Sequence, residues 1–187
     1  MKKNWILAST SPRRKELLLT ICESFKICSP DFEEKWRGEE PKDYVLGNAV
    51  GKGRSIDIQE NDVLVSADTI VVLDQKILEK PKTPQHAIEM LKELSGKTHN
   101  VMTGFFVRTQ SSEYSQVVVT EVEFREISQK EIEVYVATGE PMDKAGSYGI
   151  QGRASSMVAQ IRGSYTNVMG LPLAELIKVT DLGLGLS

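Results

Sequence analysis

The sequence WILASTSPRR, residues 5–14, decides how the chain begins to fold. A short apolar run stops at Ala8 and is followed by hydroxyl side chains, a proline and two adjacent arginines. We expect a strand that ends near Ala8 and a helix that begins at Pro12, because proline suits the first helical position and Ser11 suits the N-cap. The apolar residues after Arg14 continue this helix. A strand, a tight turn and a helix in this order predict an α/β fold.

The start of this helix is suited to an anion. The first backbone N–H groups of a helix have no partner within it, and the helix dipole places positive charge there. Arg13 and Arg14 add planar donors whose geometry matches phosphate oxygens. We interpret the turn as a binding site for a polyphosphate. A solvated basic helix start is the alternative that this segment leaves open.

Length and composition narrow the class of protein. A chain of 187 residues with 40% hydrophobic residues fits one domain over residues 1–187. The net charge of -3 argues against a general binder of nucleic acid or anionic membranes. No apolar segment is long enough to span a membrane, and the one after Met1–Asn4 is too short for a signal peptide. With two cysteines and no disulfide pattern, we expect a cytoplasmic protein.

The rest of the chain alternates strand and helix patterns. Helices are expected at residues 41–52, 84–94, 128–139 and 172–179. Strands are expected at residues 25–28, 63–73, 77–78, 99–108, 117–124 and 157–161. These patterns predict a mixed sheet with both parallel and antiparallel pairing.

Asp68 stands in the middle of an apolar strand pattern, VLVSADTIVV at residues 63–72. Aspartate is rare inside strands, and an ionised carboxylate is costly to bury without a partner. A metal ligand and a general base are the two roles that fit. The alternative is an edge or bulge position with the carboxylate in solvent. Lys52, Lys80 and the pair Glu33–Glu34 are each typical of a protein surface when taken singly.

Several motifs, in chain order, resemble those of the Maf family of nucleotide pyrophosphatases. They are STSPRR at residues 9–14, ADT at 67–69, KP at 80–81, SGKTH at 95–99, GEPMDKAGSYGIQG at 139–152 and NVMGLPL at 167–173. The resemblance covers essentially the whole chain. It implies hydrolysis of nucleoside triphosphates to the monophosphate and pyrophosphate with a divalent metal. It also implies an α/β fold, with an elongated mixed sheet of the Maf/inosine triphosphatase type flanked by helices, and two lobes around an active-site cleft.

The resemblance carries catalytic roles to four residues. Asp68 takes the position of the proton acceptor, and Glu34 that of an acidic residue that helps to hold the metal. Lys52 and Lys80 match the two catalytic lysines. Asp68 and Glu34 would together bind Mg²⁺ or Mn²⁺, since these ions prefer oxygen ligands. Because a bound metal lowers the basicity of a carboxylate, which of the two is the base stays open.

The resemblance also assigns the residues that bind the substrate. Ser9 and Arg14 fall in the phosphate-binding turn. Arg13, Thr69 and Gln151 are similar to the set of the subgroup that acts on dTTP and UTP, and differ from the set of the subgroup that acts on 7-methyl-GTP. Gln151 carries an amide that can both donate to and accept from a pyrimidine edge.

The family was first linked to inhibition of septum formation, and its members are commonly homodimers. These properties imply a homodimer connected with cell-division arrest, and an enzyme that clears non-standard nucleotides. A non-catalytic nucleotide-binding regulator of septum formation is the alternative. Such a regulator would need the arginines and Gln151, but not two carboxylates and two lysines, so an enzyme is favoured. The chain departs from the family at Gly53, where alanine is usual and would favour the helix.

Overall fold

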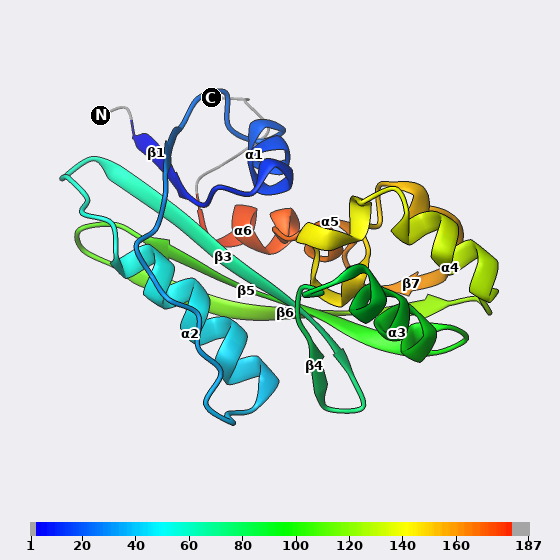
Figure 1. The fold of residues 1–187 in the computed structure, drawn as a ribbon. Helices are drawn as coiled ribbons and strands as arrows, with labels where there is room; N and C mark the ends of the chain where they lie inside the picture. Colours follow the sequence, from blue (N-terminus) through cyan, green and yellow to red (C-terminus); the bar gives the residue numbers. More distant parts are fainter. Residues whose placement is uncertain (1–2, 181–187) are drawn as a thin grey trace. The chain divides into compact units, whose positions relative to one another are not determined.

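The computed structural model describes residues 3–180, in which strands and helices alternate (Figure 1). The strands are β1 Asn4–Ala8, β2 Lys26–Cys28, β3 Asp62–Leu73, β4 Lys76–Leu78, β5 Thr98–Arg108, β6 Glu113–Phe124 and β7 Val158–Arg162. The α-helices are α1 Pro12–Leu19, α2 Pro41–Arg54, α3 Pro84–Leu94, α4 Gln129–Val136, α5 Tyr165–Met169 and α6 Leu173–Val179. Short 3-10 helices span Glu140–Asp143 (η1), Ala145–Ser147 (η2) and Arg153–Met157 (η3). Within these residues, no helix is long and apolar enough to cross a membrane.

The strands of the described residues form one mixed sheet of seven strands, as the sequence predicts. Their order is β2-β1-β3-β5-β6-β7, and β4 pairs with β3 outside this path. β1 runs parallel to both β2 and β3, with Ala8 opposite Ser66. β3 and β4 form an antiparallel hairpin, and β6 pairs with β7 in the antiparallel sense. The prediction of a mixed α/β fold is confirmed.

The chain divides into two compact units. Within the described residues, unit 1 holds the chain up to Asp68, Thr103–Val118 and the chain from Gly170 onward. Unit 2 holds Thr69–Met102 and Val119–Met169. The prediction of one domain over residues 1–187 stays a prediction, and residues 1–2 and 181–187 lie outside the described part.

Unit 1 is built on β1 and β3, with α2 on one side of the strands and α1 and α6 on the other (Figure 1). Ile6, Leu64 and Phe106 form its apolar core together with Ala49 on α2. A side chain at Gly53 would meet the Phe106 ring and lie 2.7 Å from Ser66 Oγ. Glycine in a helix interior costs roughly 1 kcal/mol relative to alanine, and here it lets α2 approach the sheet closely.

Unit 2 has its own core, which α3 and α4 cover. Both helices bury residues spaced three and four apart, as an amphipathic helix does. These residues are Ala87, Leu91, Leu94, Ile132, Tyr135 and Val136. The predicted capping box of α4 is present, because Ser128 Oγ accepts from Glu131 N–H and Glu131 accepts from Ser128 N–H. Hydrogen bonds from Arg125 and then Ser128 lower the pKa of Glu131 to about 2.

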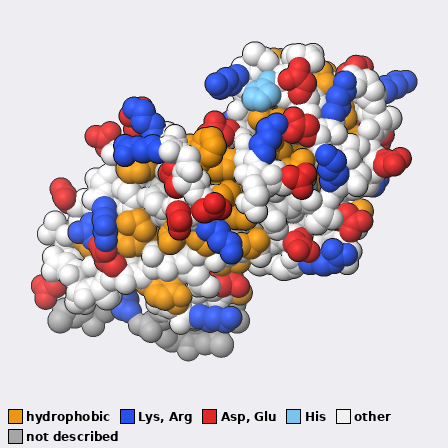
Figure 2. Space-filling model, turned by 90° about the horizontal axis from the view of Figure 1, so that it is seen from below, with side chains coloured by type: hydrophobic (Ala, Val, Ile, Leu, Met, Phe, Trp, Pro, Cys, Tyr) orange, Lys and Arg blue, Asp and Glu red, His pale blue; other side chains and the backbone are white. Residues whose placement is uncertain are grey.

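Charges of both signs are interspersed on the face that Figure 2 shows. Lys and Arg side chains alternate there with Asp and Glu, as a chain with 23 basic and 26 acidic residues allows. This mixed surface agrees with the net charge of -3.

The core of unit 2 contains a buried histidine. His99 Nε2 lies 2.7 Å from the hydroxyl of Tyr148, and the His99 ring packs edge-on against Phe124. Burial lowers the pKa of His99 from 6.5 to about 4, because a charged imidazole would lose its hydration there. His99 Nδ1 has no hydrogen-bond partner among the described residues. The second N–H of a protonated imidazole would therefore have no acceptor there.

This histidine makes the stability of the fold depend on pH. The unfolded chain binds a proton at His99 below pH 6.5, whereas the folded chain does so only near pH 4. Stability is therefore lost as the pH falls through this window, by about 3 kcal/mol in total. The free energy of unfolding should fall by that much more in the parent protein than in His99→Gln, measured by urea at pH 7 and pH 4. Equal losses would show that His99 does not cause the dependence.

Candidate active site

The carboxylate of Asp68 is held by two donors from α2. Asp68 is buried in β3, with 6% of its surface exposed. Lys52 Nζ donates to Oδ1 at 2.7 Å, and Asn48 Nδ2 donates to Oδ2 at 2.9 Å. The two donors lie four residues apart, so the helix presents them on one face. Asp68 is thus a buried, paired carboxylate, and the alternative of an aspartate in solvent is wrong.

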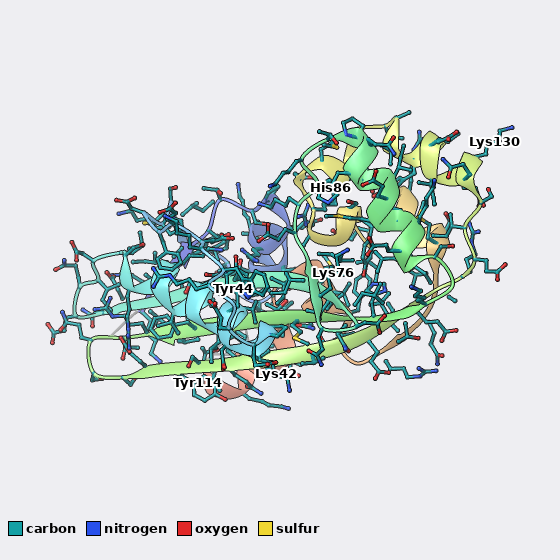
Figure 3. The ribbon with its side chains drawn as sticks, turned by 60° about the horizontal axis from the view of Figure 1, so that its bottom comes forward. Lys42, Tyr44, Lys76, His86, Tyr114 and Lys130 are labelled. Carbon is teal, nitrogen blue, oxygen red and sulfur yellow. The ribbon has the colours of Figure 1, made fainter. Side chains whose placement is uncertain are left out.

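Helix α2 carries these donors on a regular stripe. Tyr44, Asn48 and Lys52 follow one another at intervals of four residues, and all three are buried. Tyr44, which Figure 3 labels, is the first of these three residues and lies in the first turn of α2. Sequence reasoning missed Asn48. The signal was a polar residue on the buried face of the helix, between apolar Tyr44 and Ala49.

Lys52 links two carboxylates. Its ammonium lies 2.7 Å from Asp68 Oδ1 and 2.6 Å from Glu34 Oε1. Glu34 reaches it from the irregular segment before α2, and its side chain is 45% exposed, whereas that of Lys52 is 10% exposed. A buried lysine with two acidic partners is a local charge network of two acids and one base. The structure therefore brings together Glu34, Lys52 and Asp68, three of the predicted catalytic residues.

The turn before α1 brings Arg14 close to this network. Arg14 Nε donates to the Gly170 carbonyl at 2.8 Å, and Nη1 lies 3.4 Å from Ser9 Oγ. Burial lowers the pKa of the Arg14 guanidinium, and the nearby carboxylates of Asp68 and Glu34 counteract this shift. Arginine remains a cation even so, so the cluster offers a second positive charge beside Lys52.

The predicted helix start is confirmed in position but differs in its cap. α1 begins at Pro12, with Ser11 at the N-cap. The Ser11 hydroxyl makes no capping hydrogen bond, and its backbone N–H donates to Ser9 Oγ at 3.2 Å instead. Ser9 is buried, so its hydroxyl organises the turn and contacts Arg14. Arg13 lies in the first turn of α1 and is half-buried.

The other predicted site residues belong to unit 2. Thr69 follows Asp68 in β3 and is half-buried. Lys80 follows β4 and is exposed, and Gln151 is exposed in the segment between η2 and η3. Their proximity to Asp68 beyond the sequence neighbour Thr69 stays a prediction.

The segment that carries Gln151 is wrapped around a carboxylate. Glu140 accepts from the backbone N–H of Arg153 at 3.3 Å and from the Tyr135 hydroxyl at 3.1 Å. A side chain at Gly152 would collide with the Glu140 carboxylate. The glycine therefore lets the backbone close over Glu140 next to Gln151, which fixes where the Gln151 backbone lies.

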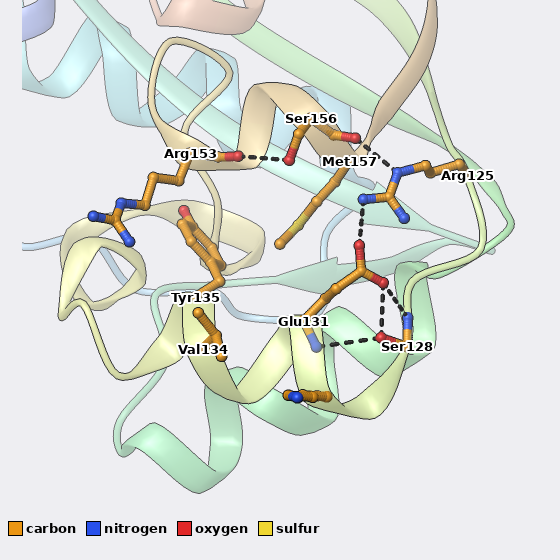
Figure 4. A pocket seen from close by; sticks show the side chains of 9 residues that line it. Arg125, Ser128, Glu131, Val134, Tyr135, Arg153, Ser156 and Met157 are labelled. Carbon is orange, nitrogen blue, oxygen red and sulfur yellow. Dashed lines mark hydrogen bonds and ion pairs between the residues drawn. The ribbon is translucent and has the colours of Figure 1, made fainter.

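Unit 2 also contains a cavity of about 310 Å³ beside α4 (Figure 4). It is lined by Arg125, Ser128, Lys130, Glu131, Val134, Tyr135, Arg153, Ser156 and Met157. The Arg125 guanidinium is already engaged there by Glu131 at 2.6 Å and by the Ser156 carbonyl at 2.8 Å. None of the predicted site residues lines this cavity.

The fold and the network define an α/β protein with a mixed sheet, in which a buried carboxylate–lysine pair lies beside an arginine-bearing helix start. The family model described as Maf-like protein matches residues 4–181, and this chain belongs to that family.

The sequences of curated relatives align with nearly the whole of this chain. A protein of Photorhabdus laumondii subsp. laumondii is 48% identical, covering 92% of this chain and 90% of its own length. One of Thermococcus onnurineus is 44% identical, covering 96% of this chain and 98% of its own length. One of Bacillus cytotoxicus is 44% identical, covering 94% and 93%. Each of the three is named dTTP/UTP pyrophosphatase.

Proposed function

We propose that this protein is a nucleoside triphosphate pyrophosphatase that hydrolyses dTTP and UTP to the monophosphate and pyrophosphate. The observation that carries the proposal is the buried network of Asp68, Lys52 and Glu34, with the Arg14 guanidinium beside it. The names of relatives at 44% to 48% identity support the same reaction and substrates.

The residues of unit 1 suit an attack by water on the α-phosphorus. A triphosphate repels a nucleophile until cations neutralise its charge. Arg14 and the first N–H groups of α1 would bind phosphate oxygens. Asp68 would take the proton of the attacking water, while Asn48 keeps its carboxylate in place. Lys52 would stabilise the charge that moves onto the departing pyrophosphate, a role that the resemblance also gives to Lys80 of unit 2.

The same network fits Mg²⁺ or Mn²⁺. Asp68 and Glu34 direct oxygen atoms at one ammonium, at 2.7 and 2.6 Å, so their oxygens already converge around a positive charge. Hard divalent cations prefer such oxygen ligands. Within residues 3–180, no group of three or more His, Cys, Asp or Glu side chains is placed to hold a metal, so substrate phosphates and water would complete the shell. When bound, the metal would neutralise phosphate charge and activate the water.

The choice of nucleotide would rest on Arg13, Thr69 and Gln151. The Gln151 side chain is exposed, so its amide is available to a base. An amide matches the O4 acceptor and N3–H donor of uracil or thymine, which cytosine and adenine do not present together. Guanine carries an equivalent O6 and N1–H pair on a larger ring system, so GTP would be rejected by its size. A mismatched polar group costs roughly 1–3 kcal/mol, which corresponds to about a tenfold to hundredfold preference.

The finer biological setting is also part of the proposal. We place the enzyme in the cytoplasm as a homodimer that clears non-standard pyrimidine nucleotides and does not bind nucleic acid. The lack of a disulfide pattern supports the cytoplasm, and the net charge of -3 counts against binding of nucleic acid. The homodimer and the clearance of non-standard nucleotides are taken from the family resemblance. A regulator of septum formation that binds nucleotides without turnover is the second candidate, and a rate measurement separates it from the enzyme.

Turnover across a panel of nucleotides tests the proposed specificity. We expect kcat/KM for dTTP and UTP to exceed that for GTP, ATP, CTP and 7-methyl-GTP by about tenfold to hundredfold. Gln151→Glu should lose dTTP and UTP turnover while its metal dependence stays, because the carboxylate repels the O4 acceptor. Gln110→Glu, a change of the same charge at an exposed residue of unit 1, serves as control. Equal values for UTP and GTP in the parent protein would contradict the assignment.

A further inference from the structure

The interior of helix α2 contains a glycine, Gly51, whose lack of a side chain leaves room for an aromatic ring. A side chain at Gly51 would overlap the ring of Phe32, with Phe32 Cδ2 at 2.7 Å and two further ring atoms closer still. The Phe32 ring therefore lies directly on the helix backbone at Gly51. Glycine is unfavourable in a helix interior relative to alanine, so this position gives up helix stability and gains room for the ring.

The packing of the Phe32 ring on Gly51, which we call the seat of Phe32, lies next to the contact between Glu34 and Lys52. Glu34 follows Phe32 by two residues, and Lys52 follows Gly51 directly. Two neighbouring points of the segment thus meet two neighbouring points of α2, one apolar and one ionic. The residues from Asp31 to Gly38 are exposed and form no helix or strand. Apart from the contact with Lys52, the hydrogen bonds described for them, such as that from Trp36 Nε1 to the Glu39 carbonyl, stay within the segment before α2.

An anchor two residues away limits where the Glu34 carboxylate can lie. Two residues span at most about 7 Å of chain, so a fixed Phe32 keeps Glu34 within reach of Lys52. A free segment would lose conformational entropy each time it brought Glu34 to the site. An anchored segment has already lost this conformational entropy on folding. Its carboxylate is therefore in place before the reaction begins.

We propose that Phe32, seated on Gly51, is the positioning residue that holds the Glu34 carboxylate at the Lys52–Asp68 pair. The inference rests on the proposed function, in which Glu34 helps to hold the divalent metal. The apolar ring of Phe32 offers no ligand to a metal. Phe32 acts through Glu34, so its loss lowers the affinity for the metal more than the affinity for the nucleotide.

Gly51→Ala tests the seat, with Gly47→Ala as the matched control. Both changes add one methyl group to the same helix, but a side chain at Gly47 meets nothing within 4 Å. In Gly51→Ala we expect the concentration of Mn²⁺ for half-maximal UTP hydrolysis to rise about tenfold, while KM for UTP at saturating Mn²⁺ changes less than threefold. Gly47→Ala should match the parent protein in both. Phe32→Leu should need a Mn²⁺ concentration close to that of the parent protein, because leucine still packs on Gly51. Phe32→Ala should need as much Mn²⁺ as Gly51→Ala.

A double variant shows whether the seat acts through Glu34. Gly51→Ala combined with Glu34→Gln should need no more Mn²⁺ than Glu34→Gln alone. Fully additive effects would overturn the proposal, as would a parent-like Mn²⁺ requirement in Gly51→Ala.

Trypsin provides a readout that needs no activity. The segment offers cleavage sites after Lys35 and Arg37. Cleavage there should be faster in Gly51→Ala than in Gly47→Ala, at equal melting temperatures, because the segment leaves the helix. Equal cleavage rates would overturn the proposed seat whatever the protein hydrolyses. A protein that shows the cleavage difference but hydrolyses no nucleotide would instead contradict the proposed function.

Discussion

Asp68→Asn should lower kcat by about 10²–10⁴-fold while the protein stays folded. The amide keeps the shape of the side chain, and its one oxygen can still accept one of the two hydrogen bonds, from Asn48 or from Lys52. Lys52 keeps Glu34 as an ion-pair partner. It cannot accept the proton of an attacking water, and it binds a divalent cation poorly. The measurement is steady-state hydrolysis of UTP with saturating Mg²⁺, with circular dichroism and melting temperature as checks on the fold. Turnover close to that of the parent, in a folded variant, would remove Asp68 from the mechanism.

Lys52→Met should reduce both catalysis and stability. Methionine fills similar space without charge, so the buried Asp68 carboxylate loses its ion pair. Breaking a buried pair by removing one partner costs roughly 3–5 kcal/mol. We expect the free energy of unfolding, measured with urea, to fall toward that range. We expect kcat to fall about 10²–10³-fold, more than KM rises, because Lys52 would act on charge that develops in the transition state.

The double variant Lys52→Met with Asp68→Asn separates the two effects. It removes both charges, so much of the lost stability should return while activity stays low. If the double variant is as unstable as Lys52→Met alone, the ion pair is not the cause of the instability. If Lys52→Met changes KM alone, the lysine binds phosphate equally in the ground state and the transition state.

The regular elements of the fold could be predicted because their signals are local. Alternating apolar residues marked β5 and β6, and Ser128 with Glu131 marked the start of α4 through a capping box that the structure confirms. The end of α4 was less exact. We predicted a helix to Gly139, whereas α4 ends at Val136 and Gly139 takes a left-handed conformation with φ of 75°.

The glycine-rich segment was harder to predict, because its shape depends on tertiary contacts. Its short 3-10 helices were missed, as was the five-residue α5. Gly146 has φ of 65°, and a side chain there would meet Val71. Ser147, also with positive φ, is fully buried, with its hydroxyl 3.1 Å from Met90 Sδ. No periodicity in the sequence reports such contacts between distant residues.

The candidate site shows the same division. The unusual position of Asp68 within an apolar strand was visible in the sequence, and burial in β3 agrees with it. That Lys52 would reach it, and that Asn48 would share the task, depends on how α2 packs on the strands of unit 1. Sequence spacing alone allowed Lys52 to be a surface lysine. The resemblance to the Maf family gave Lys52 and Asp68 roles in one reaction, but the ion pair between them appears only in the structure.

Hydrolysis of UTP in water enriched in ¹⁸O tests the central claim most directly. If water attacks the α-phosphorus, the bond from this phosphorus to the bridging oxygen of pyrophosphate breaks, and the water oxygen remains on UMP. Mass spectrometry should then find one ¹⁸O atom in UMP and none in pyrophosphate. Label in pyrophosphate, or release of orthophosphate with UDP, would place the attack at another phosphorus and contradict the account.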